Sequence, residues 1–189
     1  INKNRIKELR EGFDRTNEVS REDLICQNNL IFTDNLEDLY NSDVFIITVP
    51  TPIDKFKKPN FGALINASKM IGTIIKSRKS KNYPIIIYES TVYPGATEEV
   101  FIPILEKQSK LKLNENFYVG YSPERINPGD KEHRLTSIVK ITSGSNESSS
   151  NWINNLYGSI IKAGTYKASS IKIAEAAKVI ENTQRDINI

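Results

Sequence analysis

The chain has 189 residues, of which 38% are hydrophobic and 26% charged, the balance of a globular rather than a disordered protein. Its formal net charge is only +3, which gives no reason to expect nucleic-acid binding. No apolar run approaches the roughly 20 residues that cross a bilayer, and the first residues lack a signal peptide, so no membrane association is expected. The single Cys26 excludes an internal disulfide and favours a cytoplasmic protein, in which Cys26 is a small packing residue.

Short β-branched runs alternate with longer amphipathic stretches, which predicts an α/β fold with a parallel sheet. In chain order we expect a helix over 2–11, a short strand over 30–32 and a buried strand over 43–49. A helix over 61–80, a strand over 85–89 and a helix from the turn at 93–95 through about 108 follow. Two further strands are expected over 117–120 and 138–141, and then a helix that carries Trp152, Leu156 and Ile160. The last segment, 169–189, contains no Gly or Pro and is rich in Ala, Glu and Lys, which predicts one long helix.

Polar segments follow three of the predicted strands. They are Val49-Pro50-Thr51-Pro52, the segment from Glu89 to Gly95, and the segment from Gly120 to Gly129. Because ligands of parallel α/β sheets bind beyond the carboxyl ends of the strands, these three segments are the predicted site.

The motifs in these segments resemble those of the UDP-glucose/GDP-mannose dehydrogenase family, and within it the branch acting on UDP-N-acetylhexosamines. That family carries a V-P-T-P loop, an S-T-V-x-P-G loop and an S-P-E-R-x-x-P-G loop, all of which stand here in the same order. Its A-E-x-x-K-x-x-x-N helix matches residues 174–182. The resemblance covers essentially all 189 residues.

The resemblance implies a fold and an organisation. Residues 1–168 would form a Rossmann-like NAD-binding domain whose first strand and glycine loop are missing, because no two glycines stand at G-x-G spacing. Residues 169–189 would begin a long connecting helix that supports dimerisation in the family. The chain is therefore expected to be an internal portion of a longer protein, which at full length forms a homodimer or a higher homo-oligomer.

The resemblance also implies a reaction, the NAD-dependent four-electron oxidation of the C6 alcohol of a UDP-N-acetylhexosamine to the uronic acid, for surface polysaccharide synthesis. Two NAD molecules are needed, and a cysteine thiolate captures the intermediate aldehyde. Cys26 precedes the strand at 43–49 and is not that cysteine, so this chain alone is expected to be inactive.

Residue by residue, the family pattern assigns the following roles. The catalytic residues would be Thr91, Glu124, Lys178 and Asn182; the cofactor-binding residues would be Arg5, Thr51 and Thr91; and the UDP-sugar substrate would contact Glu124, Arg125, Ile126, Asn127, Lys178 and Asn182, with no metal. The chemistry of these side chains agrees: Lys178 and Asn182 are four residues apart on one helix face, as suits oxyanion stabilisation, and a loop carboxylate such as Glu124 can act as a general base.

Each assignment has a plainer alternative. Glu124 could be an idle loop carboxylate paired with Arg125, Lys178 a solvent-facing lysine, and Thr91 part of a turn. His133, the only histidine, is expected in a surface loop, and Pro128 replaces a second glutamate of the UDP-glucose branch. Two rival functions stay open, a hydroxyacid-type dehydrogenase with a single hydride transfer and a catalytically inactive nucleotide-binding or scaffolding relative.

Overall fold

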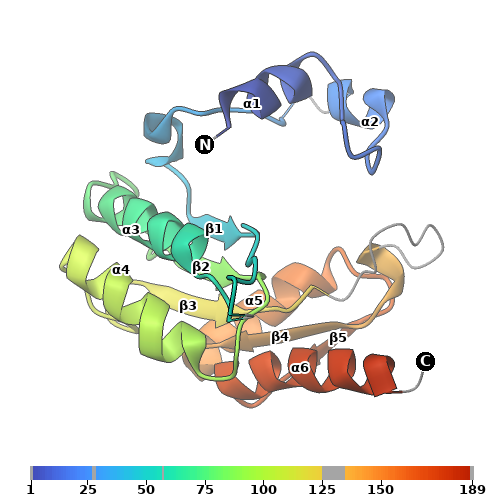
Figure 1. The fold of residues 1–189 in the computed structure, drawn as a ribbon. Helices are drawn as coiled ribbons and strands as arrows, with labels where there is room; N and C mark the ends of the chain where they lie inside the picture. The colour runs from blue at the N-terminus through green and yellow to red at the C-terminus, as the bar shows by residue number, and fades with distance from the viewer. Residues whose placement is uncertain (1, 27–28, 57, 125–134, 188–189) are drawn as a thin grey trace. The chain divides into compact units, whose positions relative to one another are not determined.

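The computed structural model describes residues 2–26, 29–56, 58–124 and 135–187 (Figure 1). The chain divides into two compact units, Ile1–Asn41 and Ser42–Ile189, and each is described by itself. This division falls after residue 41 and does not test the predicted boundary between residues 1–168 and 169–189, which stays a prediction.

The N-terminal unit contains helices α1 (Lys3–Arg10) and α2 (Arg21–Ile25) and the 3-10 turn η1 (Leu36–Leu39). The helix predicted over 2–11 is confirmed as α1, which begins where the Asn2 side chain accepts a hydrogen bond from the Arg5 amide at 3.1 Å. The strand predicted over 30–32 is wrong, because these residues form neither strand nor helix, and Ile31 is 78% exposed. Cys26 is exposed at the end of the short α2, so its predicted packing role is also wrong.

The second unit is built on one five-stranded sheet. Its strands lie in the order β1 (Val44–Ile47), β2 (Ile85–Tyr88), β3 (Tyr118–Tyr121), β4 (Lys140–Gly144) and β5 (Thr165–Lys167). Strands β1, β2 and β3 are parallel, β4 runs antiparallel to β3, and β5 is parallel to β4. The predicted α/β Rossmann-like class is confirmed, whereas the expectation of a wholly parallel sheet fails at β4.

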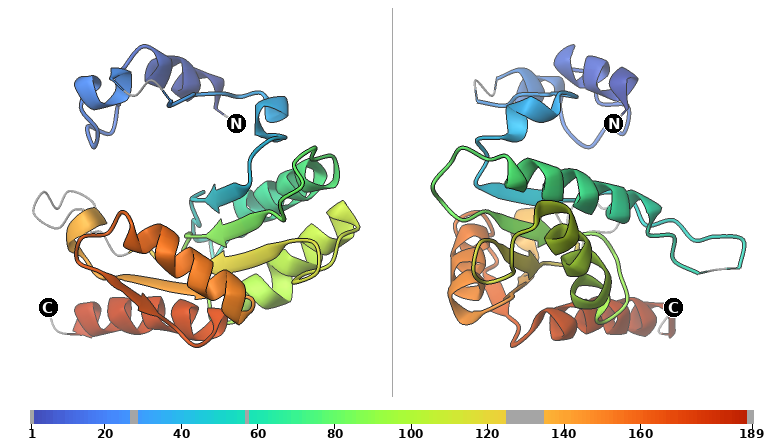
Figure 2. Two further views of the ribbon diagram at one scale, coloured as in Figure 1. Left: turned by 180° about the vertical axis from the view of Figure 1, so that it is seen from behind. Right: turned by 90° about the vertical axis from the view of Figure 1, so that its left-hand side faces the viewer.

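Helices cover both faces of the sheet. They are α3 (Gly62–Lys76), the π-helical turn η2 (Thr97–Phe101) that continues into α4 (Ile102–Ser109), α5 (Glu147–Gly158) and α6 (Ile171–Ile187). Helices α3 and α4 lie side by side, and α6 packs against β3, β4 and η2 (Figures 1 and 2). The long helix predicted over 169–189 is thus present as α6.

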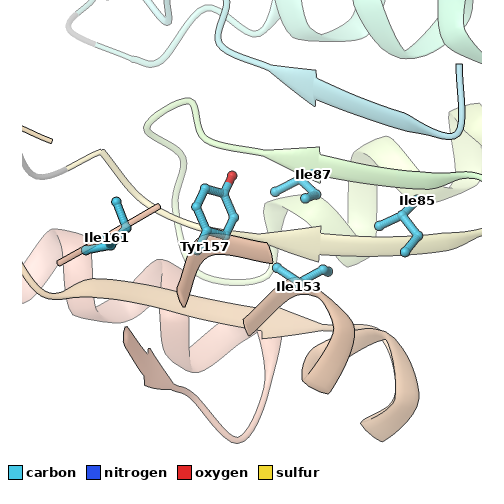
Figure 3. Packing of buried hydrophobic residues seen from close by; sticks show 5 residues of the cluster. All are labelled: Ile85, Ile87, Ile153, Tyr157 and Ile161. Carbon is cyan, nitrogen blue, oxygen red and sulfur yellow. The ribbon is translucent and has the colours of Figure 1, made fainter. Parts of the chain in front are cut away.

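Strand β2 is buried on both sides, and its alternating side chains divide the core. Ile85 and Ile87 pack against Ile153 and Tyr157 of α5 (Figure 3). On the other face the ring of Tyr88 stacks on Phe101, with centroids 5.0 Å apart. Strand β2 is therefore held from both faces, which fixes the loop that follows it.

The reversed strand β4 approaches β3 very closely. Gly120 pairs with Gly144, and Tyr121 pairs with Ser143. A Cβ atom on Gly120 would lie 2.3 Å from Cδ1 of Ile153 and 2.5 Å from the Ser143 carbonyl oxygen. Only glycine fits there, so the β3–β4 register depends on Gly120.

The described ranges contain neither a membrane-spanning helix nor a metal-binding cluster. No helix there is both long and apolar enough to cross a membrane. No group of three or more His, Cys, Asp or Glu side chains in the same ranges could hold a metal ion.

Candidate functional site

A cavity of about 320 Å³ lies at the carboxyl ends of the parallel strands. Residues from three loops line it: Thr48, Val49, Pro50 and Thr51 after β1; Glu89, Ser90 and Thr91 after β2; and Glu124 after β3. The structure thus brings together Thr51, Thr91 and Glu124, which are far apart in the sequence. Their chemical roles stay predictions.

Hydrogen bonds between neighbouring loops hold the cavity wall. The Ser90 hydroxyl donates to the Val49 carbonyl at 2.6 Å, which joins the loops after β1 and β2. The fully buried Tyr121 donates its hydroxyl to the Ser90 carbonyl at 3.2 Å, which joins β3 to the second loop. Burial raises the pKa of Tyr121 well above its usual value, so this hydroxyl remains a donor.

The Thr51 hydroxyl is buried, and no hydrogen-bond partner for it lies among the described residues. A buried hydroxyl without a partner costs roughly 1–3 kcal/mol, so native structures seldom keep one without a reason. Because Thr51 lines the cavity, a ligand with a polar group could satisfy this hydroxyl. The site therefore has an unused hydrogen-bonding group at the position predicted to border the cofactor.

Helix α6 reaches the same edge of the sheet through Lys178. This side chain is 8% exposed, and its Nζ donates to the backbone carbonyl of Glu124. The alternative of a solvent-facing lysine is wrong, because the Glu124 contact keeps Lys178 buried. Asn182 is partly buried one turn further along α6.

Sequence reasoning missed the role of Glu175, which is fully buried on α6. Its carboxylate accepts hydrogen bonds from the amides of Gly95 at 2.5 Å and Thr97 at 2.9 Å. Burial raises the pKa of Glu175 above its ordinary value, although these hydrogen bonds oppose the shift. The glutamate thus ties α6 to the segment that follows Thr91, and its place three residues before Lys178 was the available signal.

A second missed group lies behind the cavity wall, where Lys140 at the start of β4 is only 3% exposed. Its Nζ lies 3.2 Å from Oε1 of Glu89 and 3.4 Å from the Pro123 carbonyl oxygen. The Tyr157 hydroxyl donates to the same Oε1 of Glu89. Lys140, Glu89 and Tyr157 are called the buried cluster below.

The remaining predicted residues belong to the N-terminal unit or lie outside the described residues. Arg5 belongs to the N-terminal unit, where its guanidinium donates to Asp14. Arg125, Ile126 and Asn127, together with Pro128 and His133, lie outside the described residues.

Comparison with known proteins gives consistent matches. Residues 1–161 match the model of the NAD binding domain of the UDP-glucose/GDP-mannose dehydrogenase family. The chain is 59% identical over 189 residues to a UDP-N-acetyl-D-glucosamine 6-dehydrogenase of Pseudomonas aeruginosa, and 54% identical over 189 residues to one of Salmonella typhi. All of this chain is covered in both cases, but only 44% and 43% of those proteins.

A solved structure of a UDP-D-ManNAc dehydrogenase from Pyrococcus horikoshii superposes with a TM-score of 0.88 at 31% identity. That match covers 100% of this chain and 44% of the other. The chain thus spans less than half the length of the relatives it matches.

Proposed function

The chain belongs to the UDP-glucose/GDP-mannose dehydrogenase family, and on that premise we propose that the protein oxidises the C6 alcohol of a UDP-N-acetylhexosamine to the uronic acid. The observation that carries the proposal is the cavity that gathers Thr51, Thr91 and Glu124, with Lys178 reaching the Glu124 carbonyl from α6. The relatives named as UDP-N-acetyl-D-glucosamine 6-dehydrogenases support this substrate class.

NAD is the cofactor of this family's domain, and it supplies an acceptor for the hydride that leaves the substrate carbon. The residues present fit it, because the cavity lies at the carboxyl ends of parallel strands and the buried Thr51 hydroxyl has no partner among the described residues. We assign Thr51 and Thr91 to cofactor binding. Arg5 is assigned to the adenosine end by family pattern alone.

Within the proposal, Glu124 holds and moves the proton. Its carboxylate accepts a proton from the attacking water or from the substrate hydroxyl, aided by the hydroxyl of Thr91. Lys178 and Asn182 donate hydrogen bonds to the oxygen on which negative charge develops at C6. Arg125, Ile126 and Asn127 would contact the substrate, as the family motif implies.

We further propose that the full-length protein is a cytoplasmic homodimer that serves surface polysaccharide synthesis. Ile173, Ile180 and Ile187 of α6 recur every seven residues and are 52%, 66% and 75% exposed. Apolar side chains in such a row favour packing against a second copy. Size-exclusion chromatography with light scattering on the full-length protein tests this, and a monomer at micromolar concentration would contradict it.

The reaction is tested by the stoichiometry of the full-length enzyme with NAD and limiting UDP-N-acetylglucosamine. Absorbance of reduced nicotinamide should reach two equivalents per sugar, because an alcohol becomes a carboxylate only by losing two hydrides. One equivalent would favour the single-hydride alternative, and none would favour the inactive relative. Replacing Glu124 by Gln should lower kcat about 10²- to 10⁴-fold, while the exposed control Glu115→Gln should leave kcat unchanged.

The cofactor assignment is tested at Thr51. Thr51→Val removes the hydroxyl and should raise the Kd for NAD about fivefold, since one hydrogen bond contributes about 1 kcal/mol. The melting temperature should not fall, because the lost hydroxyl has no partner among the described residues. Thr51→Ser is the matched control and should bind NAD like the wild type; equal Kd values for all three proteins would refute the assignment.

A further inference from the structure

The buried cluster contains a cation, the ammonium group of Lys140, that is shielded from solvent. Lys140 is 3% exposed, and the side chain of its partner Glu89 is 14% exposed. A buried ammonium is retained only when nearby acceptors compensate for its lost hydration. Here the Glu89 carboxylate and the Pro123 carbonyl provide that compensation, and the Tyr157 ring lies 5.2 Å from Nζ.

The two acceptors of Lys140 belong to different loops of the cavity. Glu89 stands two residues before Thr91 in the loop after β2, and Pro123 stands immediately before Glu124 in the loop after β3. One ammonium group at 3.2 and 3.4 Å therefore spans the gap between the segments that carry Thr91 and Glu124.

Strand direction explains how Lys140 reaches this position. Because β4 runs antiparallel to β3, its first residue lies at the edge where β3 ends. In a wholly parallel sheet the beginning of β4 would lie at the opposite edge. The antiparallel direction of β4 thus places Lys140 beside Glu89, which lines the cavity.

Tyr157 fixes the carboxylate from a third direction. Burial raises the pKa of Tyr157 far above its usual value, and the charge of Glu89 raises it further, so the hydroxyl stays protonated and donates to Oε1. Lys140 and Tyr157 therefore meet at one oxygen atom of Glu89. This leaves the carboxylate little freedom to turn.

We propose that Lys140 is a positioning residue that sets the separation of Thr91 and Glu124, with Tyr157 and Glu89 holding its ammonium in place. The inference rests on the proposed function, since it concerns the two residues assigned to proton handling there. Catalytic groups must be held to within about 0.5 Å of their productive positions, and buried hydrogen-bonded neighbours supply that constraint. Lys140 itself is not assigned any contact with substrate or cofactor.

The experiment compares Lys140→Met, Lys140→Arg and wild type in the full-length enzyme. Lys140→Met should lower kcat about 10- to 100-fold, as expected for misplaced catalytic groups, while the Kd for NAD changes by less than about threefold. Lys140→Arg keeps a cation with several donors and should recover kcat to within about fivefold of wild type. Amide hydrogen exchange over residues 89–92 and 120–124 should rise in Lys140→Met and return toward wild type in Lys140→Arg.

Several outcomes would overturn the proposal. A folded Lys140→Met enzyme that keeps kcat within twofold shows that the cation positions nothing, and so does an arginine variant no better than methionine. If Lys140→Met does not fold, Tyr157→Phe decides: it removes one hydrogen bond to Glu89, so kcat should fall about threefold while the melting temperature falls by only a few degrees. An unchanged kcat in Tyr157→Phe overturns the proposal. If wild type does not oxidise the UDP-sugar, the proposed function fails, and the exchange comparison still decides whether Lys140 orders the two loops.

Discussion

Each of the two units contains a buried carboxylate that accepts backbone hydrogen bonds, but the two carboxylates differ in depth of burial and in their other partners. Asp14 in the N-terminal unit accepts from the amides of Glu18 at 3.0 Å and Val19 at 3.1 Å, and it is also paired with Arg5. Glu175 on α6 accepts from two amides, and no cation pairs with its carboxylate among the described residues.

The balance between hydrogen bonding and burial decides the sign of the pKa shift. The hydrogen bond from Arg5, with others from Thr16 and Val19, holds the pKa of Asp14 far below its usual range. Burial without a cation raises the pKa of Glu175 instead. The same side-chain chemistry therefore stabilises the charged form in one unit and the neutral form in the other.

The largest expected effect comes from removing the carboxylate without a cation. Glu175→Ala leaves the buried amides of Gly95 and Thr97 without their acceptor, which should cost about 3 kcal/mol of unfolding free energy. Chemical denaturation of the full-length protein measures this loss. The control Lys172→Ala, at an exposed position of α6, should change stability by less than about 0.5 kcal/mol, and equal losses in the two variants would show that Glu175 is not an anchor.

A smaller and more local effect is expected at Asp14. Asp14→Asn keeps the shape but removes the charge that Arg5 pairs with, which should cost about 1–2 kcal/mol. Hydrogen exchange over residues 2–25 should rise, because Asp14 accepts its hydrogen bonds from residues of that segment. Glu22→Gln, at an exposed position of α2, is the control, and equal exchange over residues 2–25 in the two variants would contradict the prediction.

The smallest effect is the opposite response of the two carboxylates to acid. The pKa of Asp14 is depressed, so its stabilisation is complete above about pH 4 and is lost as the pH falls through the folded value. The pKa of Glu175 is raised, so the native state binds more protons above about pH 4 and stability falls as the pH rises through the folded value.

This difference is measured by following exchange-derived stability from pH 7 to pH 3 in wild type, Asp14→Asn and Glu175→Gln. The advantage of wild type over Asp14→Asn in residues 2–25 should shrink below pH 4. Replacement of Glu175 by neutral Gln should flatten the pH dependence of the sheet unit between pH 4 and 7. Parallel curves for all three proteins would mean that neither carboxylate titrates differently on folding.

Much of this arrangement could be predicted from sequence. The apolar runs at Val44–Ile47 and Ile85–Tyr88 predicted two strands, of which β2 is buried and β1 leaves Ile46 48% exposed. Strand polarity then predicted that Thr51, Thr91 and Glu124 lie at one edge. These predictions depend on local pattern and on a general rule of parallel sheets. For that reason they hold without knowledge of the tertiary contacts.

The parts that were missed depend on contacts that pattern does not encode. Lys140 was missed because periodicity does not reveal strand direction, and only the antiparallel pairing brings it beside Glu89. Strand β5 has three residues, two of them exposed, and gives no apolar signal. The error at Ile31 is the opposite one: the apolar run at 30–32 predicted a strand where the structure has none, and Ile31 is exposed.

The pairing of Gly120 with Gly144 lets a position between β3 and β4 affect the geometry of the candidate site. A methyl group at Gly120 would collide with Ile153 and with the Ser143 carbonyl, so the two strands would have to separate or slip. Lys140 begins the strand that would move, and its ammonium contacts both the loop that carries Thr91 and the loop that carries Glu124. A single added carbon at Gly120 would thus change the geometry of the candidate site through strand register, without any contact with the residues that line the cavity.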